Sequence, residues 1–128
     1  MSDFLQSFAV SASGMRAQAQ RLRHVAENIA NADTPGYHRK MVPFEASTRD
    51  ADGQVRTGPV RLDQSALSQI YDPSHPMADE AGYYEGSNVN TILEVADSRE
   101  AQRSYEANLK MFDQTRKMSS ALLDLLRR

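Results

Sequence analysis

The chain has 128 residues, of which 15 are Lys or Arg and 17 are Asp or Glu, and it contains no cysteine. The near balance of charge argues against electrostatic capture of nucleic acid. The absence of cysteine excludes disulfides, thiolate catalysis and zinc sites with Cys ligands. The length indicates one domain.

Residues 4 to 31 are predicted to form one long helix, because apolar residues return at alternating steps of three and four. Two series with a seven-residue spacing resemble the seam positions of a heptad. They are Leu5, Ala12, Ala19 and Ala26, and then Phe8, Met15, Leu22 and Ile29. Ser13 is an alternative N-cap from which the rigid part of the helix could start. Pro35 disfavours helical geometry at Thr34, so the helix must end before that residue.

The middle of the chain, residues 37 to 88, is predicted to form loops and small β elements. Turn-forming residues interrupt it at Pro43, Gly53, Gly58, Pro59, Pro73, Pro76, Gly82 and Gly86. Short alternating stretches, such as residues 55 to 62, are typical of strands. No internal repeat is evident.

A second long helix is predicted to begin at Asn88 or Asn90, either of which can act as N-cap, and to run to about Leu126. Glu94 is then favourably placed near the positive end of the helix. The seam of this helix follows a four-three alternation through Ala101, Tyr105, Asn108, Phe112, Thr115, Ser119, Leu122 and Leu126.

The composition of the first seam argues against an autonomous two-stranded coiled coil. Three of its positions are Ala12, Ala19 and Ala26, and together they bury on the order of 7 kcal/mol less than leucines would. Small residues suit a helix that is packed on several sides. The pattern leaves two interpretations open, namely an intramolecular helical hairpin and a bundle built from several subunits.

Catalytic chemistry has no foundation in this sequence. The three histidines, His24, His38 and His75, lie in no catalytic frame, and we expect them to be surface or packing residues. Gly-rich phosphate loops are missing, and we expect neither a cofactor nor a metal. The sequence shows no conventional secretion signal and no apolar run near 18 residues.

The segment from Asn28 to Tyr37, with the sequence NIANADTPGY, resembles a signature of the bacterial flagellar rod and hook protein family. Asn28 is expected to satisfy carbonyls at the helix end, Asn31 to form a left-handed cap, and Tyr37 to pack back on the helix. Pro35 and Gly36 suit the centre of a type II turn. The run from Ala101 to Asn108 resembles the second signature of the same family.

Within this family, the stretch from Tyr71 to Asp79, followed by Gly82 and Tyr83, is similar to proximal-rod members. The resemblance implies a mainly α fold in which long N- and C-terminal helices pair as a coiled-coil-like bundle. Residues 1–36 and 89–128 would form the helical rod core domain, and residues 37–88 a central loop and short-β segment.

The same resemblance implies a structural subunit that assembles through its terminal helices into the helical drive shaft, which transmits motor torque. Its partners would be other rod proteins, basal-body adapter subunits, further copies of itself and the flagellar export apparatus, which would export it without a cleaved signal. No nucleic acid or membrane insertion is expected. The residues expected to carry assembly are Asn28, Asn31, Thr34, Pro35, Gly36, Tyr37, Arg103, Tyr105, Asn108, Phe112, Leu122 and Leu126. The alternative function is a soluble helical-hairpin adapter or regulator, which would form a stable, finite oligomer.

Overall fold

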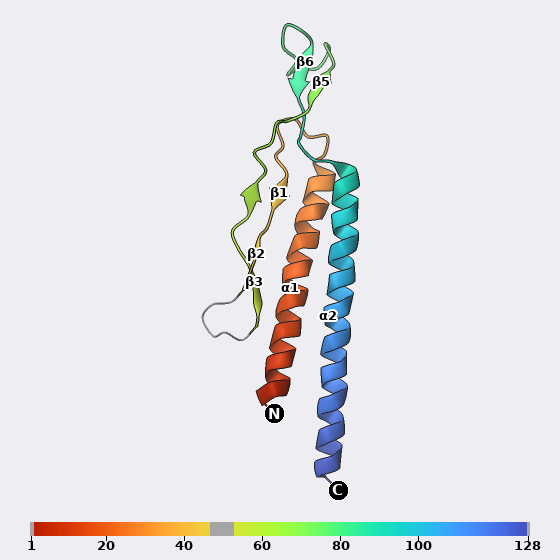
Figure 1. Cartoon of the computed structure of the whole chain (residues 1–128). Coiled ribbons are helices and arrows are strands. Elements are labelled where there is room, and N and C mark those ends of the chain that lie inside the picture. Colours follow the sequence, from red (N-terminus) through yellow and green to blue (C-terminus); the bar gives the residue numbers. More distant parts are fainter. Residues whose placement is uncertain (1, 47–52, 128) are drawn as a thin grey trace.

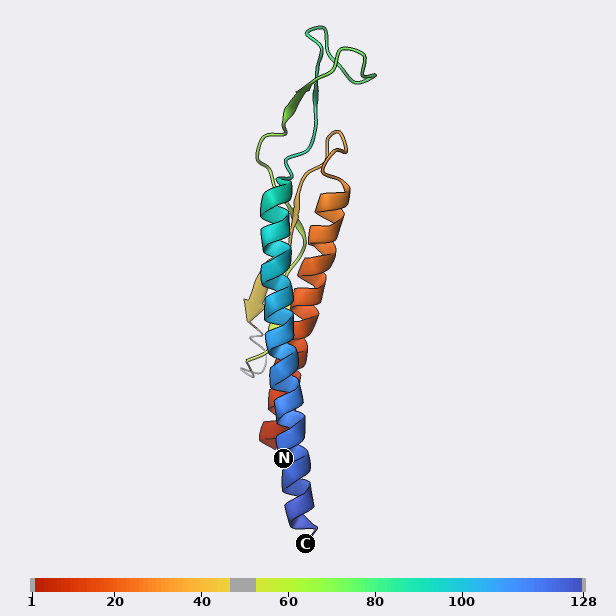
Figure 2. The same ribbon diagram turned by 90° about the vertical axis from the view of Figure 1, so that its right-hand side faces the viewer.

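Two long helices dominate the computed structural model, which describes residues 2–46 and 53–127. Helix α1 spans Ser2–Ala30 and helix α2 spans Thr91–Leu126, and the two lie side by side along most of α1 (Figures 1 and 2). Both predicted helices are confirmed. The alternative start at Ser13 is wrong, because α1 continues through this residue without interruption.

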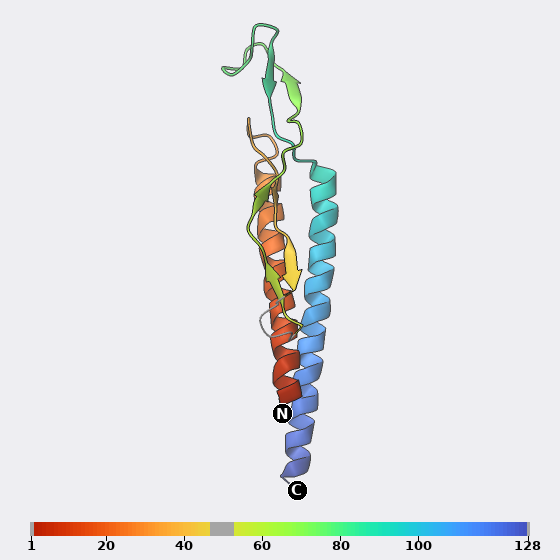
Figure 3. The same cartoon turned by 60° about the vertical axis from the view of Figure 1, so that its left-hand side comes forward.

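Short strands occupy the central segment, as the sequence predicts. They are β1 (Lys40–Met41), β2 (Phe44–Ala46), β3 (Val55–Thr57), β4 (Arg61–Leu62), β5 (Gln69–Tyr71) and β6 (Tyr83–Glu85). Strand β1 pairs with β4, β2 with β3, and β5 with β6, each pair being antiparallel. The first two ladders run along α1, whereas the β5–β6 hairpin stands beyond the helix ends (Figure 3).

The face that α2 turns toward α1 has the predicted four-three period. Ala101 is fully buried and Thr115 is nearly so, and both belong to the predicted series. Phe112 contacts Phe8 of α1, with ring centroids 4.9 Å apart. The phase of the α2 seam is therefore correct over the length that α1 covers.

The predicted phase of α1 is wrong for one of its two series. Leu5 is 68% exposed, and Ala19 and Ala26 are also exposed. Phe8, which belongs to the other predicted series, contacts α2. Outside both series, α2 is also approached by Ser11, Gly14, Arg21 and Asn28. A Cβ atom at Gly14 would lie 2.8 Å from the Asn108 side chain, so glycine permits the close approach of the helices there.

A second face of α1 is covered by the central strands. The backbone N–H of Val55 donates to Ser13 Oγ at 3.1 Å, and Thr57 Oγ1 donates to Gln20 Oε1 at 2.7 Å. Ser13 is consequently buried although it is polar. The third face of α1, which carries Leu5, Ala19 and Ala26, faces solvent.

The apolar core is thin. Over residues 3–46 and 53–127, the buried hydrophobic side chains are Ala17, Val25 and Ala101. The accessible surface of the chain is 8966 Å², whereas a compact monomer of this mass would expose about 6,800 Å². The single chain therefore leaves exposed an area comparable to a large subunit interface.

Helix α2 extends past the start of α1, so its last turns lie alongside no other element (Figure 1). Leu122, Leu123, Leu125 and Leu126 lie on these turns, and all four are exposed. Across the described part of the chain, no helix is long and apolar enough to cross a membrane.

Candidate assembly site at the helix junction and the exposed seam

The end of α1 is stopped by the residues of the Asn-to-Tyr motif. Asn31 Nδ2 donates to the Glu27 carbonyl at 2.8 Å, and Thr34 Oγ1 donates to Asn31 Oδ1 at 3.1 Å. The N–H of Tyr37 donates to the Thr34 carbonyl across Pro35 and Gly36, and Gly36 has φ +75°. These features are those of a type II turn, which confirms the predicted turn.

We expected Asn28 to satisfy carbonyls at the end of its own helix, and this expectation is wrong. Its side chain pairs with the backbone of Lys40 instead: Nδ2 donates to the Lys40 carbonyl at 3.0 Å and Oδ1 accepts from the Lys40 N–H at 2.9 Å. The Tyr37 hydroxyl also donates to Asn28 Oδ1 at 2.9 Å, so Tyr37 packs back on the helix as predicted. Asn28 thereby joins β1 to α1 as a neighbouring strand would.

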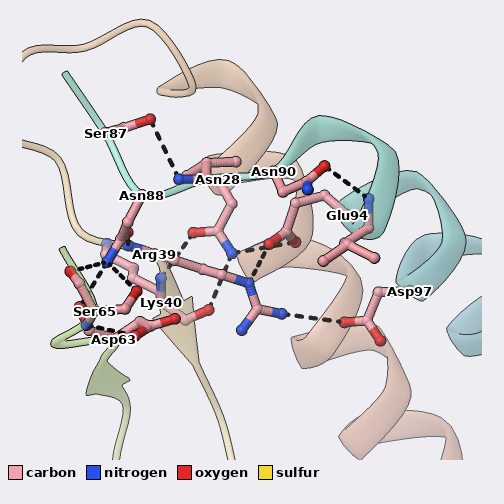
Figure 4. A network of polar contacts seen from close by, with 12 residues as sticks. Asn28, Arg39, Lys40, Asp63, Ser65, Ser87, Asn88, Asn90, Glu94 and Asp97 are labelled. Atoms are coloured by element: carbon pink, nitrogen blue, oxygen red, sulfur yellow. Dashed lines mark hydrogen bonds and ion pairs between the residues drawn. The ribbon is translucent and has the colours of Figure 1, made fainter. Parts of the chain in front are cut away.

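Glu94 is fully buried at the start of α2, and its charge is paired with Arg39 (Figure 4). Arg39 Nε donates to Glu94 Oε1, while Asn28 Nδ2 lies 3.4 Å from Glu94 Oε2. Arg39 Nη2 also lies 3.8 Å from Asp97, and Asp97 accepts a hydrogen bond from Arg21 of α1. A single charged network therefore joins α1, α2 and the segment that follows α1.

Two asparagines fix the chain where it enters α2. Asn90 is the N-cap, since its Oδ1 accepts from the N–H groups of Ile92 and Leu93. Asn88 Oδ1 accepts from the Arg39 N–H at 2.6 Å, and Asn88 Nδ2 donates to the Asp63 carbonyl at 2.8 Å. Of the two predicted caps, Asn90 caps the helix and Asn88 holds the central segment.

The charges around this junction shift the pKa values of their partners. The hydrogen bond between Lys40 Nζ and Glu27, 2.8 Å long, raises the pKa of Lys40 and lowers that of Glu27. Burial lowers the pKa of Arg21, but the hydrogen bond and charge of Asp97 outweigh burial and raise it overall. Burial raises the pKa of the Tyr37 hydroxyl. The pair of Lys40 and Glu27 is therefore charged near neutral pH.

The predicted residues of α2 fall into three groups. Phe112 and Asn108 lie on the seam against α1, and Tyr105 borders a shallow apolar hollow with Ala12, Met15 and Ala19. Arg103 is exposed. Leu122 and Leu126 lie beyond α1 and are 47% and 81% exposed. The structure thus brings the seam residues together but leaves Arg103 exposed and places Leu122 and Leu126 beyond the end of α1.

The histidines have the structural surroundings expected of packing residues. His38 Nδ1 lies 2.9 Å from the Asp63 carbonyl, and the ring of His75 stacks on Tyr84 at 3.9 Å. His24 lies on α1 with both ring nitrogens buried. Within residues 2–46 and 53–127, no three His, Asp or Glu side chains are placed to share a metal ion.

Replacing Gly36 with Val is expected to destabilise the turn by about 1–2 kcal/mol, because a β-branched residue is strained at positive φ. No atom lies within 4 Å of the position that a Cβ would take, so the cost comes from the backbone alone. Urea unfolding of the purified chain measures the loss. Gly36→Asn is the matched control, since Asn tolerates this conformation. Equal stability of the Val and Asn variants would contradict the turn assignment.

The two signatures that converge on this junction and seam match families of known proteins. A family model described as "Flagella basal body rod protein" matches residues 8–38, and one described as "Flagellar basal body rod FlgEFG protein C-terminal" matches residues 80–125. The flagellar basal-body rod protein FlgC of Agrobacterium fabrum is 42% identical over 127 residues, covering 92% of this chain and 91% of the relative. The chain belongs to the FlgC family of flagellar basal-body rod proteins.

More distant FlgC proteins match over the same length. That of Aquifex aeolicus is 37% identical, covering 92% of this chain and 93% of the relative, and that of Salmonella typhimurium is 33% identical, covering 94% and 96%. These FlgC relatives are structural rod proteins and not enzymes. The regions matched by the two family models include both sides of the junction and most of the seam of α2.

Sequence reasoning missed the Arg39–Glu94 pair. From the sequence, Glu94 is expected only to interact favourably with the positive end of α2. A usable signal exists, because Glu94 lies seven residues before Ala101 and therefore on the same buried face. A carboxylate on such a face requires a cation, but the sequence alone does not say which basic residue supplies it.

Proposed function

We propose that this chain is a structural subunit of the proximal rod of the flagellar basal body and that it assembles through α1 and α2 into the helical drive shaft. The assembled rod transmits motor torque. In this proposal α1 and α2 of each copy pair in a coiled-coil-like manner, and neighbouring copies cover the faces that one copy leaves in water.

The thin core is the observation that carries this proposal. Three small or medium apolar side chains form the buried apolar core of the described residues, whereas large apolar side chains are exposed on both helices. On α1 these side chains include Leu5 and Ile29, and on α2 they include Met118 and Leu122. Covering such area supplies the favourable free energy of association.

The same geometry suggests different roles for the terminal helices and the central segment. Residues 1–36 and 89–128 would form the rod core, with Asn28, Tyr37, Phe112 and Leu122 among its contact or positioning residues. Residues 37–88 would lie on the outside of the helix pair, where the central strands already cover one face of α1. The junction of Arg39 and Glu94 would fix the angle between the two parts.

The proposed partners are other rod proteins, basal-body adapter subunits and further copies of this chain. We also propose that the flagellar export apparatus carries the chain from the cytoplasm to the basal body without a cleaved signal peptide. A thin core favours this route, because little apolar burial must be undone to pass an unfolded chain.

Amide exchange tests the proposal when the purified chain is compared with isolated basal bodies. If the chain assembles through its helices, the backbone amides of their exposed segments should become protected from exchange only in the basal body. A finite oligomer of the purified chain with both helices already protected would favour the adapter function instead.

A further inference from the structure

The β5–β6 hairpin projects beyond the ends of both helices (Figures 1 and 2). Its base is tied to the turn after α1, because the Gly36 N–H donates to the carbonyls of Gly86 and Glu85 and Ser87 Oγ donates to the Ala32 carbonyl. The hairpin therefore has a fixed root on the helix pair, while its own residues remain outside it.

The two faces of this hairpin differ. Tyr71 and Tyr83 are paired across the strands with ring centroids 5.1 Å apart, and they are 64% and 43% exposed. The opposite face carries Ile70 and Tyr84, and His75 covers Tyr84 by stacking on it. One face is therefore closed by the hairpin itself, and the tyrosine face is left open to solvent.

The hairpin tip is held in one conformation by its own hydrogen bonds. Asp79 Oδ1 accepts from the N–H groups of Ala81 and Tyr83 at 2.9 and 3.0 Å. Gly82 has φ +88°, and a Cβ there would lie 2.9 Å from the Tyr71 ring. An exposed surface that is already ordered loses little conformational entropy when it binds.

The charge of this region has one sign. No Lys or Arg occurs between Arg61 and Arg99, whereas the hairpin and its tip carry four carboxylates. They are Asp72, Asp79, Glu80 and Glu85. Asp72 and Asp79 accept hydrogen bonds that shape the tip, but the side chains of Glu80 and Glu85 are exposed and bond to none of the described residues. Two carboxylates are thus free to meet a cationic partner.

We propose that the β5–β6 hairpin is a preformed docking arm for a positively charged surface of an adjoining protein subunit. Lys or Arg side chains of that surface lie over the rings of Tyr71 and Tyr83 and beside Glu80 and Glu85. Tyrosine rings attract cations through their faces and are common anchors of protein interfaces. The inference rests on the proposed function only because assembly is what brings another subunit to the arm.

Charge and ring geometry favour a protein partner over the other candidates. The carboxylates repel nucleic acid and anionic lipid. The rings of Tyr71 and Tyr83 are inclined by 59°, so they form no flat platform of the kind on which a sugar ring would stack. Cationic side chains fit, since each can approach one ring face and one carboxylate separately.

Photocrosslinking tests the arm directly. Met77 at the tip is 62% exposed, and replacing it with p-benzoylphenylalanine places a reactive group beside the partner. In isolated basal bodies we expect an adduct with a protein, and we expect its yield to fall at least fivefold when Glu80→Lys and Glu85→Lys are added. Absence of a protein adduct, an adduct with glycan or lipid, or a yield unchanged by the charge reversals would overturn the proposal.

Competition for incorporation gives the second readout. Co-expressed with the unmodified chain, Glu80→Lys should be depleted from basal bodies at least threefold. Glu45→Lys is the matched control, because it reverses an exposed carboxylate on β2, in the central segment proposed to lie outside the rod core, and it should be incorporated normally. Normal incorporation of Glu80→Lys would refute the arm but leave the proposed rod function intact, because the amide-exchange comparison tests that function separately.

Discussion

Replacing Leu122 with Asp is expected to exclude the chain from basal bodies while leaving the free chain unaffected. Leu122 continues the heptad series of Ala101, Asn108 and Thr115, which α1 covers, but α1 does not reach it. If a neighbouring subunit covers Leu122 in the rod, an unpaired carboxylate there costs several kcal/mol, and the cost recurs at each equivalent contact. In the free chain the same carboxylate faces water.

The measurement is the ratio of variant to unmodified chain in basal bodies from cells that express both. We expect at least tenfold depletion of Leu122→Asp, which corresponds to about 1.4 kcal/mol, with unchanged solubility and secretion. Ser120→Asp adds the same charge to the same turn on the opposite side of α2 and should be incorporated normally. Equal incorporation of Leu122→Asp would refute the interface, and loss of the soluble chain would indicate an internal core.

Replacing Arg39 with Met is expected to destabilise the folded chain by about 3–5 kcal/mol, because it leaves a buried carboxylate without its cation. Glu94 has no exposed side-chain surface, and only the Asn28 amide at 3.4 Å would remain near it. A loss of this size would open the junction that joins α1, α2 and β1. The start of α2 would then exchange its amide protons rapidly.

Urea unfolding followed by helical circular dichroism measures this loss. Adding Glu94→Gln to Arg39→Met removes the buried charge, so the double variant should be more stable than the single one. Arg103→Met is the control, since Arg103 is exposed and its loss should cost under about 0.5 kcal/mol. A free energy of unfolding for Arg39→Met within this range of the unmodified chain would contradict the role of the pair.

The side of α2 that packs on α1 can be predicted from the sequence, because the apolar and small residues of this helix face one neighbour. Ala101, Asn108 and Thr115 repeat at seven residues, and the structure places all three toward α1. The C-terminal end of α1 can also be predicted, because Pro35 and Gly36 act through local backbone geometry that needs no distant partner.

The phase of α1 could be predicted only in part. This helix has an apolar or small residue on almost every face, and the side toward α2 includes Ser11, Gly14 and Asn28 rather than large apolar residues. The large apolar residues Leu5 and Ile29, one from each predicted series, are exposed in the single chain. Hydrophobic periodicity reports which faces are apolar, but it does not say which of them a second chain covers.

The polar junction depended on pairings between distant positions. Arg39 and Glu94 lie 55 residues apart, and Asn28 bonds a backbone 12 residues away. Local propensity explains why Asn28 lies near the end of α1 and why Glu94 lies in the first turn of α2. It does not reveal that the central segment returns to place Arg39 between them.

Amide exchange of residues 105–127, measured in the purified chain and in isolated basal bodies, tests the central claim most directly. We expect these amides to exchange rapidly in the free chain, where the seam is polar or uncovered, and slowly in the basal body, where neighbouring subunits bury it. Residues 91–101 should be protected in both states by the junction with Arg39. Slow exchange of residues 105–127 in a monodisperse free chain, with no further protection in the basal body, would contradict assembly through the helix ends.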